Sequence, residues 1–272
     1  MGGFRGVTLL MGVSLLGVAC GGPEAVPPSA AELTWEEFQA QAYKEPGTDV
    51  YIVEGDMAFE GTEGLRHYFD AYVAQQLGQR QDGLTLNASG AKWAGTQRMN
   101  LTYCVSSSSF GSRYSTVVSA MNSAAAAWEV IAGINFVHLS QYDSNCTSAQ
   151  TGVVFDVRQV SSGGQYLARA FFPDASRSAR ELLIDSSVFG TIVPLTLTGL
   201  LRHELGHTLG FVHESDHPDA PPTGCYSGGR GIALTAYDPY SVMNNPQCGG
   251  SSGDLILTTL DRQGAASAYP RM

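Results

Sequence analysis

The sequence predicts a protein of the α+β class, and two kinds of pattern lead to this prediction. Apolar residues recur at three- and four-residue steps over 113–132 and over 195–209, which is typical of helices with one buried face. Short runs rich in β-branched and aromatic residues, separated by glycine and serine clusters, indicate strands. These runs are 101–105, 134–139, 152–158, 165–172 and 182–185.

The individual elements are supported by residue spacing. Leu101, Tyr103 and Val105 alternate with polar or small residues, as in a strand. From Val117 to Ile131 the apolar residues mark one face of an alanine-rich helix that Gly133 ends, because glycine readily leaves the helical conformation. A shorter helical pattern at 259–269 lies near the C-terminus.

The N-terminus has the features of an export signal. Within residues 1–20, Arg5 precedes an apolar run at 7–18 that is shorter than the ~20 residues a membrane-spanning helix needs. Ala19 and Cys20 end the segment, which resembles a bacterial lipoprotein signal whose cysteine is lipidated. The alternative is cleavage after Ala19 that leaves Cys20 as a spare thiol. We therefore expect a protein outside the cytoplasm, lipid-anchored at a bacterial membrane through Cys20 or secreted.

The acidic charge is confined to one region of the chain. The whole sequence has 15 Lys and Arg against 25 Asp and Glu, a formal net charge of −10. Residues 21–90 hold twelve of the acids and three of the bases, a net charge of −9, whereas residues 91–272 are close to neutral at −2. The acidity argues against a nucleic-acid binder, which needs a cationic face. We expect three parts: a signal peptide at 1–20, an acidic tether and further segment at 21–91, and a main domain at 92–272.

One run, HELGHTLGFVHE at 203–214, has the residues of a metal site. His203 and His207 are four residues apart, so on a helix their imidazoles project from one face and could hold zinc at about 2.0–2.1 Å. Gly210 can take a left-handed conformation and end the helix, so that His213 returns as a third ligand. Three protein ligands leave one position for water, as in catalytic zinc sites.

Glu204 follows the first of these histidines and would be the catalytic base. It is placed to reach a zinc-bound water without binding the metal itself. We expect it to take the proton of that water, so that hydroxide attacks a polarised carbonyl. The alternative is a buried helix whose histidines are incidental.

This run matches the HExxHxxGxxH signature of the metzincin metallopeptidases, which the chain therefore resembles. The sequence YSVM ends at Met243, thirty residues after His213, and is similar to the methionine turn beneath the metal of that family. Glu214 resembles the residue that ties the active-site helix to the domain in astacins. Asn245 stands where astacins have a zinc-binding tyrosine, so that role is unfilled. The C-terminal LTTLDRQGAASAY resembles the closing helix of matrixins.

The resemblance implies a zincin fold and covers about residues 92–272. The fold would be a twisted, mostly parallel sheet with a backing helix at 113–132, an active-site helix, and a small irregular C-terminal subdomain. In this family an edge strand forms the upper rim of the cleft and pairs with extended substrate. Chain order assigns residues 166–172 to that rim, with an interior strand as the alternative.

The acidic segment resembles an inhibitory pro-segment. Glu54, Gly55 and Asp56 are similar to the FxGD element of astacin pro-segments, whose aspartate blocks the zinc, although Val53 stands at the phenylalanine position. A carboxylate can occupy the open position of a zinc site. Asp56 is therefore a candidate latency ligand within 21–91. A turn in a folded spacer is the alternative.

The remaining four cysteines form an even set. After Cys20 is set aside, Cys104, Cys146, Cys225 and Cys248 could form two disulfides in an oxidising compartment. Four cysteines permit three pairings, of which we prefer Cys104 with Cys146 and Cys225 with Cys248. Asp143 and Asp156 give only weak support for calcium.

The function expected from the sequence is that of a secreted zinc endopeptidase, made as a latent precursor, that hydrolyses protein or peptide substrates through one catalytic Zn²⁺. A zinc-bearing binding or adhesion module without catalysis is the first alternative, and an exopeptidase is the second. We expect no nucleic-acid partner and no membrane contact except through a lipid on Cys20. The sequence does not predict an oligomeric state.

Overall fold

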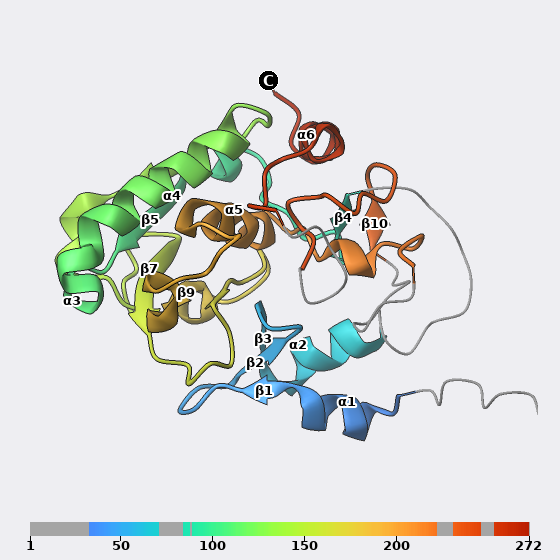
Figure 1. Cartoon of the computed structure of the whole chain (residues 1–272), viewed down its shortest axis with the longest axis horizontal. Helices are drawn as coiled ribbons and strands as arrows, with labels where there is room; N and C mark the ends of the chain where they lie inside the picture. Colours follow the sequence, from blue (N-terminus) through green and yellow to red (C-terminus); the bar gives the residue numbers. More distant parts are fainter. Residues whose placement is uncertain (1–32, 71–83, 88, 222–230, 246–252, 272) are drawn as a thin grey trace, which may run out of the picture. The chain divides into compact units, whose positions relative to one another are not determined.

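Six α-helices, six short 3₁₀ helices and ten strands are found in the described part of the chain. Figure 1 shows how they are arranged. The structure is a computed structural model, and it describes residues 33–70, 84–87, 89–221, 231–245 and 253–271. Residues 33–272 form one compact unit. The helices are α1 Trp35–Gln41, α2 Gly61–Tyr68, α3 Ser107–Phe110, α4 Tyr114–Glu129, α5 Leu197–Thr208 and α6 Thr259–Ala268. The strands are β1 Tyr43–Lys44, β2 Val50–Val53, β3 Met57–Glu60, β4 Thr85–Leu86, β5 Leu101–Val105, β6 Phe136–His138, β7 Phe155–Val160, β8 Ala168–Arg169, β9 Glu181–Asp185 and β10 Ile232–Ala233.

The central sheet has the strand order β6-β5-β7-β9-β8. The first four strands are parallel, and β8 lies at the edge, antiparallel to β9. The sheet is therefore mostly parallel, as predicted. The edge strand is shorter than the run at 165–172, and Ala170, just beyond it, forms an isolated parallel bridge with Met57 of β3.

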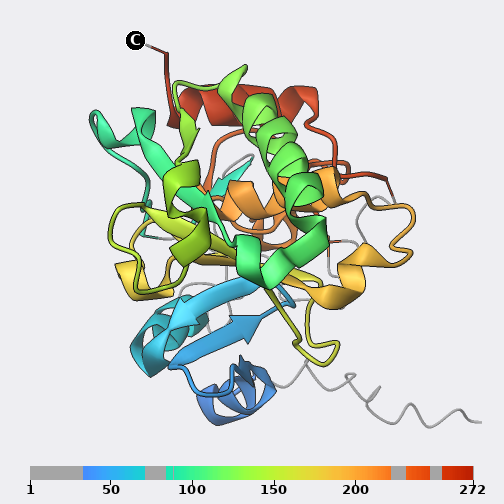
Figure 2. The same ribbon diagram turned by 90° about the vertical axis from the view of Figure 1, so that its left-hand side faces the viewer.

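Helices α4 and α5 cover one face of this sheet (Figure 2). Alternation along β9 explains why: Leu182 and Ile184 belong to the main core, whereas Glu181 and Leu183 point to the opposite face. Trp128 of α4 is fully buried and donates from Nε1 to the Arg202 carbonyl at 2.8 Å, which joins the two helices. The prediction of a backing helix and an active-site helix is confirmed.

The acidic segment forms its own small layer. Strands β1, β2 and β3 make an antiparallel sheet, and α2 packs on it through Tyr68 and Phe59 of β3. Phe38 of α1 stacks on Tyr68 and joins the two helices. A capping box at Thr34 and Glu37 fixes the start of α1. Helix α2 ends at Tyr68, and residues 71–83 lie outside the described residues.

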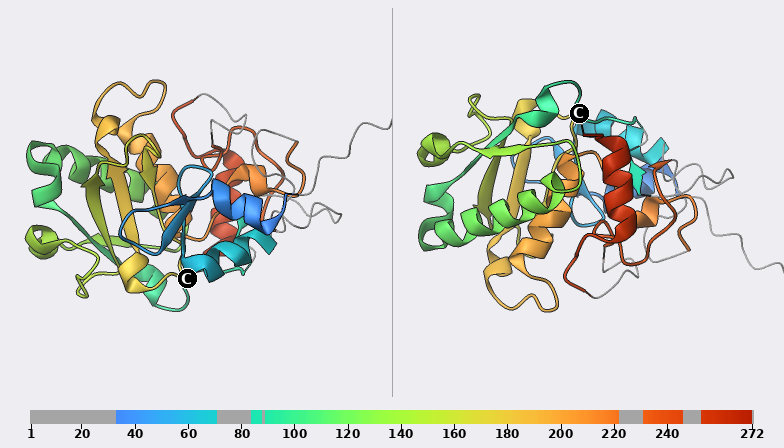
Figure 3. Two further views of the ribbon diagram at one scale, coloured as in Figure 1. Left: turned by 90° about the horizontal axis from the view of Figure 1, so that it is seen from below. Right: turned by 90° about the horizontal axis from the view of Figure 1, so that it is seen from above.

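After α5 the described chain is mostly irregular until α6 (Figure 3). This matches the expected C-terminal subdomain. Helix α6 begins at a capping box formed by Thr258 and Asp261, and its residues Ala265 and Ala268 enter the main core. Among the described residues, none of the helices combines the length and apolar character needed to cross a membrane.

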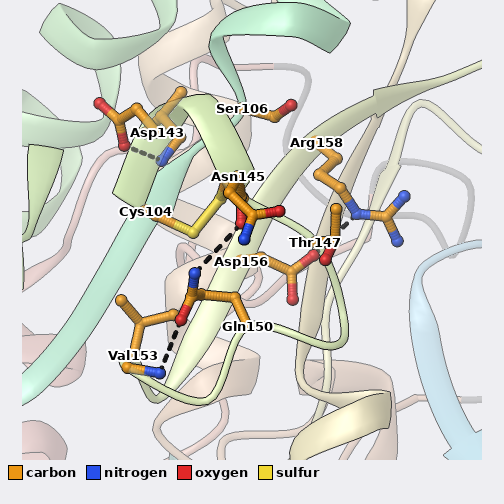
Figure 4. Close-up of a disulfide and its surroundings, with 12 residues drawn as sticks. Cys104, Ser106, Asp143, Asn145, Thr147, Gln150, Val153, Asp156 and Arg158 are labelled. Atoms are coloured by element: carbon orange, nitrogen blue, oxygen red, sulfur yellow. Dashed lines mark hydrogen bonds and ion pairs between the residues drawn. A yellow bond between two sulfur atoms is a disulfide. The ribbon is translucent and has the colours of Figure 1, made fainter. Parts of the chain in front are cut away.

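A disulfide joins Cys104 of β5 to Cys146, which is the preferred pairing (Figure 4). Cys20, Cys225 and Cys248 lie outside the described residues.

The two carboxylates considered for calcium have other partners. Asp143 accepts hydrogen bonds from the Val105 amide and the Tyr114 hydroxyl, and Asp156 pairs with Arg158 and Arg177. Both acids therefore have structural donors, and they give no support for calcium at these positions.

Candidate metal centre

Helix α5 and the turn after it bring three histidines together. His203 and His207 lie one turn apart on α5, and both are buried. Gly210 ends the helical path at φ +97°, and a side chain there would place its Cβ 2.3 Å from the Ala91 carbonyl oxygen. Only glycine meets both conditions without strain. The turn returns the chain so that His213 faces the first two histidines.

The Nδ1 atom of each histidine has an oxygen partner. His203 contacts the Val242 carbonyl at 2.7 Å, and His207 contacts the Phe211 carbonyl at 2.8 Å. His213 contacts the Glu54 carboxylate at 2.8 Å. A carbonyl or carboxylate oxygen can only accept, so each Nδ1 carries a proton and donates it. This arrangement leaves the Nε2 lone pairs available for a metal, which is the usual support for a histidine ligand.

The three Nε2 atoms and the Asp56 carboxylate converge on one point. Their ligand atoms all lie within 4.8 Å of one another. The three Nε2 atoms and Asp56 Oδ1 are buried and have no hydrogen-bond partner among the described residues. Buried nitrogen and carboxylate atoms without such partners are what a tetrahedral zinc site requires, so this donor set fits zinc.

Asp56 reaches the centre from the turn between β2 and β3. Glu54 and Gly55 in this turn both have positive φ, at 52° and 91°. The carboxylate oxygens lie 2.8 Å from His213 Nε2, 3.3 Å from His203 Nε2 and 3.8 Å from His207 Nε2. Burial raises the pKa of Asp56, but the neighbouring His213 and His203 lower it further, so the net pKa is well below its ordinary value.

Glu204 lies on α5 with no accessible surface. Neither of its carboxylate oxygens has a hydrogen-bond partner among the described residues. Burial, followed by the negative charge of Asp56, raises its pKa well above the ordinary value. Among the histidines, burial lowers the pKa of His207. In His213, burial has the same effect, but Asp56 and Glu54 outweigh it and raise the pKa.

Met243 packs against the helix that carries the first two histidines. It is fully buried, and a Cβ added to Gly206 of α5 would lie 2.2 Å from its sulfur. The turn that holds Met243 is fixed by Asp261, which accepts from the Ser241 hydroxyl at 2.6 Å and from the Val242 amide at 2.8 Å. Sequence reasoning missed Asp261, although the pattern Thr258-x-x-Asp261 before a helix is a capping signal that could have pointed to it.

Glu214 and Asn245 connect the centre to its surroundings. Glu214 accepts from the Asp238 amide at 2.7 Å, and its own amide donates to the Met243 carbonyl at 2.9 Å. Burial above all raises the pKa of Glu214 to about 8. Asn245 donates from Nδ2 to the Glu54 carbonyl at 2.7 Å. Sequence reasoning left Asn245 without a role and did not single out the side chain of Glu54, because both contacts join segments far apart in the chain.

Comparison with known families shows to which family the chain belongs. A family model described as matrixin matches residues 92–227, which is half of the sequence. The chain belongs to the matrixin family. It is a metzincin-type zinc metallopeptidase with the mostly parallel α+β fold expected for one.

Two solved structures of myroilysin are similar to this matrixin. The first is 18% identical with a TM-score of 0.48 and covers 69% of this chain and 98% of its own. The second is 16% identical with a TM-score of 0.44 and covers 69% of this chain and 95% of its own. Among curated proteins, none matches this chain.

Proposed function

We propose that the chain is a zinc endopeptidase made as a latent precursor, with Asp56 as the group that blocks the metal. The observation that carries the proposal is the position of the Asp56 carboxylate, 2.8–3.8 Å from all three histidine Nε2 atoms. His203, His207 and His213 would hold the zinc, and Asp56 would take the fourth position, where water is needed for catalysis.

The chemistry after removal of the segment depends on few residues. Bound zinc would supply a Lewis acid that polarises the scissile carbonyl and lowers the pKa of a water. Glu204 would accept the proton of the attacking water and deliver it to the leaving nitrogen. Its carboxylate has no competing hydrogen bond among the described residues, so it is available for this transfer. Asn245 would turn its Nδ2 donor from the Glu54 carbonyl to a substrate carbonyl.

The edge of β8 is the proposed path of the substrate. Ala170, just beyond this strand, donates to the Asp56 carbonyl and accepts from the Ala58 amide, each at 3.1 Å. The acidic segment thus uses the main-chain groups that an extended substrate would use, in a parallel orientation. An edge that pairs along an extended chain favours internal cleavage over removal of terminal residues.

The latency is tested with the full chain. Asp56→Ala should give an untrimmed protein that cleaves an unfolded protein substrate, whereas the untrimmed wild type should be inactive. Asp49→Ala is the matched control, because Asp49 lies in the same segment with a side chain that is 70% exposed. If Asp56→Ala is as inactive as the wild type before trimming and both are active after it, Asp56 does not block the site.

The chemistry is tested on the trimmed protein. Glu204→Gln should lower kcat by about 10²–10⁴-fold, the usual contribution of a general base. A chelator should abolish activity and added zinc should restore it. Activity that survives either treatment excludes this mechanism. Cleavage of a peptide with both termini blocked distinguishes an endopeptidase from an exopeptidase.

The location of the protein is a separate proposal that rests on residues 1–20. We propose export and lipidation at Cys20, and mass spectrometry of the mature N-terminus decides between a lipidated cysteine and cleavage without lipid.

A further inference from the structure

Glu45, just after β1, is bound by three donors from the main domain. The Tyr166 hydroxyl donates to Glu45 Oε1 at 2.6 Å, Arg169 Nε donates to the same oxygen at 3.2 Å, and Arg169 Nη2 donates to Oε2 at 2.5 Å. Two parallel bonds from a guanidinium, completed by a phenol, form a complete site for a carboxylate. Nothing in the proposed zinc chemistry uses it.

This site is built into the face of the sheet opposite α4 and α5. Arg169 is paired in register with Leu183 of β9, so both side chains point to that face. Val50, Ile52 and Leu183 form an apolar cluster with Tyr166 there. Arg169 has no accessible surface, and in such surroundings its bonds to a carboxylate are stronger than they would be in water.

The ion-pair network of Arg169 is balanced in charge only when Glu45 is included. Ion pairs link Arg169 to Glu45 and to Glu181, and Glu181 also pairs with Arg158. Arg158 also pairs with Asp156, and Asp156 pairs with a third cation, Arg177. The linked groups are the cations Arg158, Arg169 and Arg177 and the acids Glu45, Asp156 and Glu181. Because Glu45 is the one acid of the network that belongs to the acidic segment, removal of this segment leaves the network with three cations and two acids.

The titration of Glu45 agrees with a bound, ionised carboxylate. Burial raises its pKa, but Arg169 and Tyr166 outweigh burial and lower it. A groove of about 600 Å³ opens beside Glu45 and is lined by residues of both the acidic segment and the main domain, Tyr166 and Glu181 among them. Tyr166 therefore borders an open space beside the position that Glu45 fills.

We propose that Arg169 and Tyr166 form a carboxylate-binding subsite that accepts an acidic side chain of the protein substrate once the acidic segment has been removed. The inference rests on the proposed peptidase function and names its substrate class: extended polypeptides with Asp or Glu at one fixed distance from the cleaved bond. In the latent chain Glu45 occupies the subsite as an internal mimic of that residue.

The first test measures cleavage. The full chain is folded, trimmed, and given peptides that differ only by Glu or Gln at one position at a time around a fixed cleavage site. At one position the Glu peptide should have a kcat/KM about tenfold above that of the Gln peptide. This ratio corresponds to the lower end of the range of free energies that hydrogen bonds to a charged group contribute. The readout is this Glu-to-Gln ratio within each variant. It should fall to about one in Arg169→Met and to an intermediate value in Tyr166→Phe.

Tyr166→Phe keeps the aromatic ring in its apolar cluster and removes only the hydroxyl, so it remains informative if Arg169→Met does not fold. A ratio of one at every position in the wild type overturns the subsite. So does a ratio that is the same in the wild type and in every folded variant.

The second test measures binding and needs no catalysis. A labelled peptide of residues 42–60 and its Glu45→Gln form are titrated onto the trimmed Glu204→Ala protein, and fluorescence anisotropy gives each Kd. The Glu45 peptide should bind about tenfold more tightly. Equal affinities overturn the subsite. If the Glu45 peptide binds more tightly than its Glu45→Gln form while the trimmed wild type cleaves none of the peptides, the subsite stands and the proposed peptidase function fails.

Discussion

The Glu54 carboxylate accepts a hydrogen bond from His213 Nδ1 at 2.8 Å, so the acidic segment orients the third histidine of the metal centre as well as contacting it. His203 and His207 take their Nδ1 acceptors from main-chain carbonyls of the main domain. Only His213 depends on the acidic segment for its partner. Because an Nδ1 acceptor fixes the tautomer and the ring of a ligand, removal of this segment changes the support of one ligand in three.

Glu54→Ala should therefore weaken latency. Loss of a hydrogen bond to a charged group is worth about 1.5–3 kcal/mol, which would raise the rate of trimming by roughly 10–100-fold if trimming follows opening of the segment. Glu54→Gln is the control, since its amide oxygen can still accept from Nδ1. The measurement is the rate at which a fixed dose of protease converts the full chain to active enzyme. Equal rates for all three proteins would show that this contact does not hold the segment.

Asn245→Ala should affect both forms of the protein. The Nδ2 donor that binds the Glu54 carbonyl at 2.7 Å is lost, so the full chain should be trimmed faster. In the trimmed enzyme kcat should fall by about 10²–10³-fold if the same donor stabilises the developing oxyanion. Steady-state kinetics on one peptide separates the roles, because a donor that only binds ground-state substrate raises KM and leaves kcat unchanged.

The sequence predicted the parts of the site that lie close together in the chain. His203, His207, Gly210 and His213 fall within one helix and one turn, where local geometry determines which side chains meet. Helices α4, α5 and α6 were also predictable, since their apolar spacing depends on their own residues, whereas the short helix α3 was not predicted. Met243 was found through a motif at a familiar distance from the histidines.

The contacts across the acidic segment could not be predicted in the same way. Arg169 looked like one residue in a strand, and its pairing with Glu45 requires two chain segments more than a hundred residues apart to pack against each other. Asp56 was an exception, because its turn resembles a known element. The bridge between Ala170, just beyond β8, and Met57 of β3 likewise joins segments that are far apart in the chain.

Gly206→Ala should disturb the packing of Met243 against α5 and destabilise the protein. Its Cβ would lie 2.2 Å from the Met243 sulfur, so the helix or the methionine must move. Overpacking of this kind costs about 1–3 kcal/mol. Gly64→Ala is the control, because Gly64 lies in α2 with its nearest neighbour 3.8 Å from the added Cβ, and alanine in a helix is favoured by roughly 0.5–1 kcal/mol. Thermal unfolding should show a lower Tm for the first variant only.

Asp185 should make stability depend on pH in the acid range. Burial raises its pKa, but hydrogen bonds from Ser187 and Ser162 outweigh burial and lower it to about 2. A carboxyl whose folded pKa is depressed adds stability above its unfolded pKa of about 3.9, and that stability is lost as the pH falls through 2. Asp185→Asn should have a lower free energy of unfolding than the wild type above about pH 4. This difference between the two proteins should become smaller as the pH falls from about 4 to about 2. A constant difference in urea unfolding across that range would contradict this assignment.

Removal of the disulfide should destabilise the protein without altering the metal centre. Cys104 and Cys146 are 42 residues apart, and closing a loop of that length is worth about 4 kcal/mol through the entropy of the unfolded chain. The paired change Cys104→Ala with Cys146→Ala avoids an unpaired thiol and leaves α5 and its histidines untouched. Urea unfolding of the full chain should show a midpoint well below that of the wild type, whereas zinc binding by the folded variant should keep its stoichiometry. An unchanged midpoint would mean that this disulfide does not reduce the conformational entropy of the unfolded chain. Loss of zinc at urea concentrations below the midpoint would mean that β5 supports the metal centre directly.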